Sequence, residues 1–327
     1  MTGRCPGRAA GLRGTIVDCN LSMATRSSER SRRFARRIGV ALVALALFGI
    51  MVSSSLASPS TSSRATIAVL SAAMGSNDVA ANKCPNNTAT GLDNLPIVFN
   101  WFIRPTSVKA SDFTIVNQNG TTSHPLCALQ YPPDERNELQ TINLIGSFGE
   151  SQTGQRPVRV EFSGALQGRP IGAQQWRPLG ALPAQKIVQV EAAPFIVDAW
   201  TLTPALYTGD RNRCSPGVGA TFVRVVWSNG VTAYSDSGEI SEVGDAITAS
   251  YRAVYRLAGG GLKAFAPLAV ADLLDHGGTA AMDDNMHDLC LPPVPRGAKL
   301  HAIKIGANLV QDPNGDPNKR QTFVVRP

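Results

Sequence analysis

Residues 251–257 read Y-R-A-V-Y-R-L, and the pattern of this stretch decides the fold. Aromatic and aliphatic side chains fill the odd positions, whereas Arg252 and Arg256 stand at even positions. An alternation with a period of two places apolar side chains on one face of a β-strand and polar side chains on the other. Strands with one wet face are typical of antiparallel sheets, so the stretch predicts an antiparallel β protein.

The same alternation recurs along the chain from Leu95 onward. It is seen in the ranges 158–162, 223–227 and 301–305, and turn sequences separate such ranges at Asn119-Gly120, Asn229-Gly230 and 312–315. Only Pro267–Leu274 combines an initial proline with apolar residues at helical spacing. The fold class that follows is all-β, with two antiparallel β-sandwich domains and at most one short helix.

Composition and charge limit the classes of function. The chain has 327 residues, of which 43% are hydrophobic, enough for two folded cores. The formal net charge is +7, but nine arginines and only two acids fall within residues 1–57. The remaining chain has 22 basic and 22 acidic residues and is neutral. This balance removes the electrostatic argument for nucleic acid as a partner.

The N-terminal region predicts export. Five arginines between Arg30 and Arg37 precede an apolar run, Ile38–Val52, and small residues up to Ala57. This is the layout of a secretory signal peptide, and we expect cleavage near Ala57 after translation from Met1 or Met23. The alternative is an uncleaved anchor, although fifteen residues span only about 22 Å of helix. We expect no membrane span in the mature chain and a secreted, extracellular or cell-envelope location.

The expected organisation has four parts. They are a leader (1–57), a flexible Ser/Ala-rich spacer (58–83), a first β-sandwich domain (84–193) and a second (194–327). Four cysteines follow the leader, and an even number in an exported chain favours disulfides. Three pairings are open, and we favour Cys84–Cys127 with Cys214–Cys290, because each pair then lies within one domain. A metal site is the alternative, but no two of these cysteines have the C-x₂-C spacing.

Two segments carry a resemblance to a known class. Phe99–Gly120 reads F-N-W-F-I-R-P-T-S-V-K-A-S-D-F-T-I-V-N-Q-N-G, and the end of the chain, 306–325, places D-P-N-G-D between two apolar runs. The first segment resembles the opening of bacterial immunoglobulin-like domains, and the second resembles their closing hairpin. Residues 135–149 resemble a family of exported proteins of unassigned activity. The resemblance implies a β-sandwich with a binding or spacer role and no catalytic residues.

Two polar clusters are candidate calcium sites, because Ca²⁺ takes six to eight oxygen ligands. The candidate ligands of the first cluster are Asp283, Asp284, Asn285 and Asp288, and those of the second are Asp312, Asn314, Asp316 and Asn318. The alternative for both is a turn in which Asp and Asn side chains bond the backbone. His276 and His287 flank the first cluster, and His301 alternates with isoleucines, which predicts a half-buried structural role.

Among the four tryptophans, Trp101 and Trp227 are expected in the core and Trp176 on the surface as a ligand-binding platform. Whether the chain is an enzyme is open, but no motif for a catalytic nucleophile, a zinc hydrolase or a phosphate loop is present. We therefore expect a non-enzymatic binding or structural module, with Ca²⁺ as an optional cofactor and envelope polysaccharide or another surface protein as partner. The alternative is a secreted hydrolase acting on polysaccharide or another polymer, with paired acids in the range 283–288.

Overall fold

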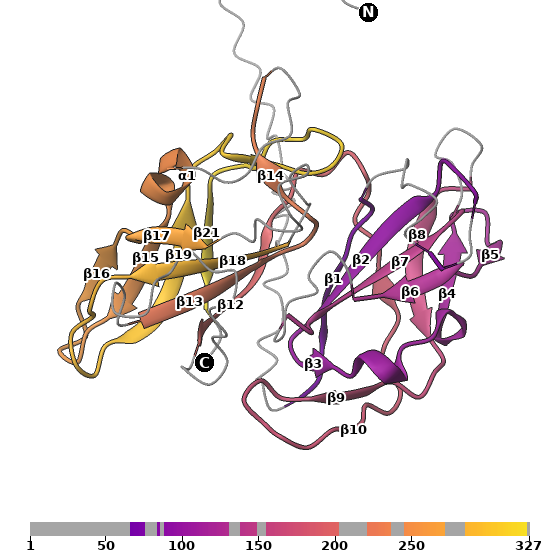
Figure 1. Cartoon of the computed structure of the whole chain (residues 1–327), viewed down its shortest axis with the longest axis horizontal. Coiled ribbons are helices and arrows are strands. Elements are labelled where there is room, and N and C mark those ends of the chain that lie inside the picture. The colour runs from indigo at the N-terminus through magenta and orange to yellow at the C-terminus, as the bar shows by residue number, and fades with distance from the viewer. Residues whose placement is uncertain are drawn as a thin grey trace, which may run out of the picture. The chain divides into compact units, whose positions relative to one another are not determined.

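The computed structural model describes residues 66–75, 84–85, 88–130, 138–148, 155–202, 221–236, 245–271 and 285–325 (Figure 1). All of these residues belong to one compact unit, Ala57–Pro327. The fold is all-β with antiparallel sheets, as the alternating pattern predicts. The described part of the chain contains a single α-helix, α1 (Asp245–Ser250), and two 3₁₀ turns, η2 (Pro105–Ser107) and η3 (Ala110–Asp112).

Residues up to 193 form the first group of sheets. Their strands are β1 (Val69–Ala72), β2 (Asp93–Phe99), β3 (Phe102–Ile103), β4 (Phe113–Asn117), β5 (Thr122–Ser123), β6 (Cys127–Leu129), β7 (Thr141–Gly146), β8 (Pro157–Phe162), β9 (Gln167–Arg169), β10 (Arg177–Pro178) and β11 (Gln185–Lys186). The sheets have the orders β1-β2-β7-β6, β11-β8-β4-β5 and β10-β9-β3. Leu95, Ile97 and Phe99 stand at alternate positions of β2 and share one buried cluster with Phe113 and Ile115 of β4. Two sheets therefore face each other across this cluster, which makes a sandwich.

Residues from 194 form the second group. Its strands are β12 (Ile196–Leu202), β13 (Thr221–Trp227), β14 (Thr232–Ala233), β15 (Arg252–Arg256), β16 (Leu262–Phe265), β17 (Ala269–Ala271), β18 (Met286–Leu291), β19 (Lys299–Ile305), β20 (Val310–Gln311) and β21 (Gln321–Val324). The sheets are β12-β13-β18-β17, β16-β15-β19-β21 and β14-β20. Val223, Val225 and Trp227 of β13 share a second buried cluster with Ala253 and Tyr255 of β15. The division of the chain into two domains stays a prediction.

The expectation of one wet face is wrong for the central strand β13. Arg224, expected to point to solvent, is only 5% exposed, and Val226 on the same side is fully buried. Val226 packs with Val98 of β2 and Met286 of β18 in a third cluster. A further layer of protein therefore covers the second face of this sheet. The alternation in β13 separates two buried environments, one apolar and one that contains ion pairs.

Two expectations about segments are also wrong. Pro267–Leu274 does not form the expected helix where it is described: Ala269–Ala271 is the edge strand β17, which pairs with β18, and 272–274 lie outside the described residues. The Leu268 N–H donates to the Cys290 carbonyl, which extends this ladder. Residues 66–75, assigned to the flexible spacer, contain strand β1, which pairs with β2. Edge pairing overrides the local preference in both segments.

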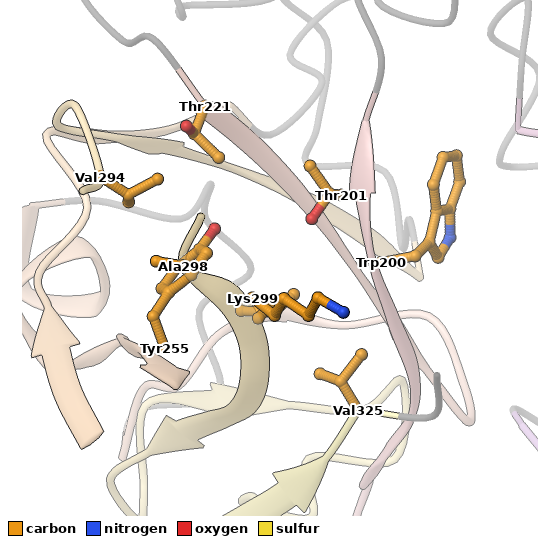
Figure 2. Close-up of a pocket in the computed structure, with 9 residues that line it drawn as sticks. Trp200, Thr201, Thr221, Tyr255, Val294, Ala298, Lys299 and Val325 are labelled. Atoms are coloured by element: carbon orange, nitrogen blue, oxygen red, sulfur yellow. The ribbon is translucent and has the colours of Figure 1, made fainter. Parts of the chain in front are cut away.

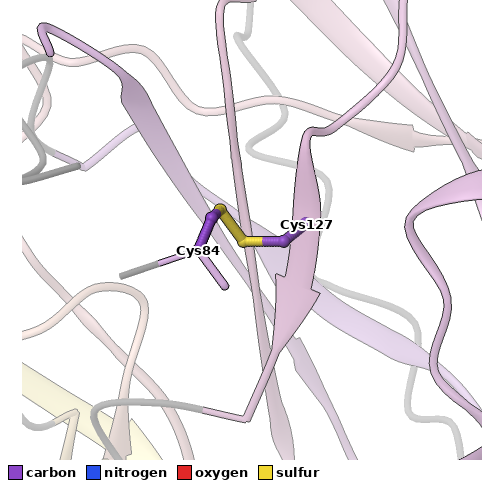
Figure 3. Close-up of a disulfide and its surroundings, with 2 residues drawn as sticks. All are labelled: Cys84 and Cys127. Carbon is purple, nitrogen blue, oxygen red and sulfur yellow. A yellow bond between two sulfur atoms is a disulfide. The ribbon is translucent and has the colours of Figure 1, made fainter. Parts of the chain in front are cut away.

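Gly259–Gly261 forms the loop between β15 and β16, where Gly260 has a φ of +86° that favours glycine. Other local expectations are confirmed. Trp101 and Trp227 are buried, and His301 is half-buried in β19. Cys84 forms a disulfide with Cys127 of β6, with a Cα–Cα distance of 5.8 Å (Figure 3). The second pairing, Cys214–Cys290, stays a prediction, because Cys214 lies outside the described residues.

Candidate functional site

A pocket of about 490 Å³ opens between the two larger sheets of the second group (Figure 2). Strands β12 and β13 supply one wall, whereas β15, β19 and the segment before β19 supply the other. The residues that line it are Trp200, Thr201, Thr221, Tyr255, Val294, Ala298, Lys299, Leu300 and Val325. The volume is in the range of sites that hold small molecules, and a mixture of apolar walls with a few polar groups is typical of such sites.

Tyr255 is the most deeply buried polar residue of this pocket. The residue is 2% exposed, and its ring packs edge-on against Phe265, with centroids 5.8 Å apart. Burial raises the pKa of the hydroxyl to about 12, and the nearby Thr201 side chain lowers this pKa only in part. No hydrogen bond of standard geometry joins the buried Tyr255 hydroxyl to Thr201 or to another described residue. Tyr255 therefore keeps an unused O–H donor in the pocket.

Two further hydroxyl groups and one ammonium group belong to the described polar lining. Thr201 is the penultimate residue of β12, Thr221 begins β13, and Lys299 begins β19, so three different strands bring these side chains to one space (Figure 2). Thr201 and Lys299 are exposed, whereas Thr221 is half-buried. Among the described residues that line the pocket, none carries a carboxylate. The lining therefore offers hydrogen-bond donors and one positive charge to a ligand.

Trp200 is among the lining residues, but its indole ring points away from the other labelled side chains (Figure 2) and packs against the first group of sheets. The indole N–H donates to Gln140 Oε1 at 2.9 Å, and Gln140 also donates to the Phe99 carbonyl at 2.9 Å and to Asp198 Oδ2 at 3.2 Å. The Phe102 ring meets the indole edge-on, with centroids 6.1 Å apart. Gln140 and Phe102 belong to the first group of sheets, so that group fixes the orientation of a pocket residue of the second.

A buried ion cluster lies beside Trp200. The Arg224 guanidinium donates to both carboxylate oxygens of Asp288, at 2.8 and 2.9 Å, and lies 3.0 Å from Glu138 Oε1. The three side chains are at most 6% exposed, and the guanidinium carbon is 5.8 Å from the centre of the Trp200 ring. A bidentate pair between buried partners fixes geometry, because any displacement exposes a charge to an apolar interior.

The first predicted calcium cluster is not a solvated loop where it is described. Asn285 and Asp288 are 2% exposed, and β18 contains Asp288. The Asn285 amide bonds Thr141 Oγ1 at 2.9 Å and the Trp227 carbonyl at 3.0 Å, whereas Asp288 bonds Arg224. Asp283, Asp284 and His276 lie outside the described residues. The two described members therefore have other partners, and they take part in the fold.

The second predicted calcium cluster forms a turn between β20 and β21. Asp312 Oδ1 accepts the N–H groups of Asn314 and Asp316, both at 3.0 Å, and Asn314 Nδ2 donates to the Gly75 carbonyl at 2.9 Å. Asn318 accepts from two N–H groups and donates to two carbonyls, so its amide has no capacity left for a metal ion. Within the ranges described, no three His, Cys, Asp or Glu side chains gather as a metal site would require.

Trp176, the predicted ligand platform, is half-buried. The Arg169 guanidinium covers its ring at 4.4 Å, and Trp176 packs against a cluster that contains Phe102 and Trp200. One face of the indole is thus occupied by a cation, and no open stacking surface results on that face. In a similar contact, the Arg177 guanidinium lies 4.2 Å from the centre of the Trp101 ring.

Sequence reasoning did not find the pocket or the ion cluster. Tyr255 and Lys299 each fit an ordinary strand pattern, and the approach of β12 to β19 gives them a shared cavity. The sequence around Arg224 could have indicated the ion cluster. A charged residue between valines of a central strand needs either contact with solvent or a buried partner of opposite charge. The signal for its partners, Glu138 and Asp288, was too weak to distinguish them from surface acids.

No protein-family model and no curated protein sequence matches this chain. Across the ranges that the structure describes, no helix has the length and apolar character to cross a membrane.

Proposed function

We propose that this chain is an exported binding module without catalysis of its own, which holds a small ligand in the Tyr255–Lys299 pocket. The lining of that pocket carries the proposal. Apolar walls supply contact area, and a few hydroxyl groups and an ammonium group supply orientation. Export rests on the basic, apolar and small-residue order of residues 30–57, and it places the module outside the cell or in the envelope.

The character of the lining favours binding over hydrolysis. Glycoside hydrolysis needs two carboxyl groups on opposite sides of the reacting bond, and the described part of the pocket lining has none. Among the acids of the described part of the chain, Asp288 and Glu138 pair with Arg224, and Asp312 bonds a turn. A second pocket contains Glu191 and Asp316, but Glu191 forms an ion pair with Arg156.

The pocket can be tested with the fluorescent probe anilinonaphthalene sulfonate, which combines an apolar body with one negative charge. We expect the purified protein to bind the probe with micromolar affinity, and Ala298→Trp to weaken binding by about tenfold or more by filling the cavity. Val325→Trp, near the end of the described chain, should act in the same direction. Leu262→Trp is the matched control, because Leu262 is 56% exposed and outside the lining.

Three outcomes bear on the proposal. Loss of probe binding in both pocket variants, with normal binding in Leu262→Trp and unchanged circular dichroism, supports it. Equal binding in the folded pocket variants overturns the pocket as the binding site. The export component is checked separately by N-terminal sequencing of protein from a bacterial culture medium or envelope fraction, where a start at Ser58 is expected and retention in the cytoplasm contradicts it.

A further inference from the structure

We infer that the pocket selects a small apolar monocarboxylate, a molecule with an aliphatic or aromatic body and one carboxylate group. The inference rests on the proposed binding function and adds the chemical class of the ligand to it. Three observations on the described lining carry it: the aliphatic wall, a set of donors that includes no carboxylate, and one exposed lysine, Lys299.

The aliphatic wall indicates an apolar body. The side chains of Val294, Leu300 and Val325 are aliphatic, and Ala298 contributes a small side chain to the same lining. Val294, Ala298, Leu300 and Val325 also pack against the core of the second group, so the cavity continues that core to the surface. A ligand with polar groups along its body would lose hydrogen bonds to water here without replacing them.

The donors indicate a head group that accepts hydrogen bonds. Tyr255 holds a buried O–H without a hydrogen-bond partner among the described residues, and a ligand oxygen would satisfy it. Thr201, Thr221 and Lys299 line the same cavity, and their side chains carry two hydroxyl groups and one ammonium group. A carboxylate is acceptor-only and has about four lone-pair sites, so it matches such a set of donors.

The charge of the lining distinguishes this class from three others. An amine would meet Lys299 with no carboxylate among the described lining residues to balance it. A phosphate dianion is usually bound by arginines or several cations, whereas the described lining has one lysine. A sugar carries hydroxyl groups on several sides and an apolar ring face, but Trp200 is 5% exposed and offers little stacking surface.

The test compares three ligands of equal chain length by isothermal titration calorimetry on the purified full-length protein at pH 7: octanoate, octanol and octylamine. We expect octanoate to bind about five- to tenfold more tightly than octanol, a ratio typical of one additional charged hydrogen bond. Octylamine should bind more weakly than octanol. Octanoate should also displace anilinonaphthalene sulfonate from the pocket.

Three variants locate the selectivity. Lys299→Gln should reduce octanoate affinity about fivefold and leave octanol affinity unchanged, which abolishes most of the preference. Lys304→Gln is the matched control, because Lys304 is an exposed lysine of the same strand outside the pocket lining. Tyr255→Phe keeps the ring and removes only the hydroxyl, and it should also weaken octanoate more than octanol.

The outcomes separate the inference from the proposed function. If octanol binds as tightly as octanoate and both displace the probe, the inferred selectivity for a carboxylate is wrong. The proposed binding function is then still supported. A preference for octanoate that survives in Lys299→Gln and in Tyr255→Phe overturns the assignment of these two residues. In a third outcome, Ala298→Trp prevents probe binding, but octanoate does not displace the probe from the parent protein. This outcome overturns the ligand class alone and leaves the pocket as the binding site.

Discussion

His287 is a fully buried imidazole, and its hydrogen bonds define its protonation. The Tyr251 hydroxyl lies 2.9 Å from Nδ1, and the Trp227 indole nitrogen lies 3.3 Å from it. An indole N–H only donates, so Nδ1 is an acceptor and the ring is neutral, with its proton on Nε2. Desolvation lowers the pKa of His287 to about 4, against a smaller raising effect from Asp288.

This lowered pKa predicts a loss of stability in acid. The unfolded chain takes up a proton on His287 as pH falls below about 6.5, whereas the folded chain resists this down to about pH 4. The free energy of unfolding should therefore fall between pH 6.5 and 4, by about 3 kcal/mol from this residue. Urea titrations at several pH values measure the slope, and His287→Gln should remove it. An unchanged slope in a folded His287→Gln protein would contradict the assignment.

Asp312 acts in the opposite direction over almost the same range. Burial raises the pKa of its carboxyl group to about 6, although the N–H groups of Asp316 and Asn314 lower it in part. A raised pKa in an acid means that its contribution to stability is fully present below pH 3.8 and is lost as pH rises through 6. The effects of His287 and Asp312 on the free energy of unfolding therefore oppose each other, and their sum depends less on pH than either effect alone.

The substitution Asp312→Asn isolates that second effect. The amide keeps the oxygen that accepts from Asn314 and Asp316 but cannot ionise. We expect the variant to gain about 1 kcal/mol at pH 7 relative to pH 4, compared with the parent protein, after allowance for solvent around the turn. Denaturant titrations at the two pH values give the difference. A variant whose pH profile matches the parent would show that Asp312 does not titrate as described.

At the scale of elements, the sequence predicted strands better than it predicted what covers them. The alternating pattern identified β8, β13, β15 and β19, because a strand with an inward apolar face has apolar residues at every second position of its own sequence. It could not show that the second face of β13 is also buried, since that depends on packing against β2, far away in the chain. Likewise, β17 is a strand because it pairs with β18, and the local sequence of β17 does not indicate this pairing.

The turn between β20 and β21 shows the same limit for candidate sites. A run of Asp and Asn residues suits both a metal loop and a turn whose side chains bond the backbone, and only geometry separates the two. The geometry of Asn318 favours the turn. Its amide oxygen accepts from the N–H groups of Leu309 and Val310, and its amide nitrogen donates to the carbonyls of Gly306 and Lys319.

Asn318→Ala should therefore lower the free energy of unfolding by a large amount for a single substitution in a turn. Four hydrogen bonds are lost, and the partly buried backbone groups that they satisfied become unpaired, which we expect to cost about 2–4 kcal/mol. Lys319→Ala is the adjacent control on an exposed residue and should change the free energy of unfolding by less than about 0.5 kcal/mol. Equal stability of the two variants in chemical denaturation would show that the Asn318 bonds contribute little.

At the scale of the whole molecule, the Arg224 cluster connects the two groups of sheets. Glu138 precedes β7 in the first group, whereas Arg224 and Asp288 belong to β13 and β18 of the second. Gln140 makes a second connection through Trp200 and Asp198. Buried polar contacts have strict geometry, so these residues favour a single relative position of the strands that they join. Trp200 also lines the pocket, so the same contacts support the proposed binding site.

Arg224→Met tests that role. The substitution keeps an unbranched side chain but leaves the carboxylates of Asp288 and Glu138 without the guanidinium, so we expect a loss of about 3–5 kcal/mol in the free energy of unfolding. Arg159→Met is the matched control, because Arg159 forms an exposed ion pair with Glu161 and should cost less than about 1 kcal/mol. Guanidinium unfolding followed by tryptophan fluorescence measures both variants.

If the cluster joins the two groups energetically, the parent protein unfolds in one transition and Arg224→Met splits or broadens it. A cost no greater than that of Arg159→Met, with the transition unchanged, would mean that apolar packing of Val98, Val226 and Met286 holds the groups together without the ion pairs.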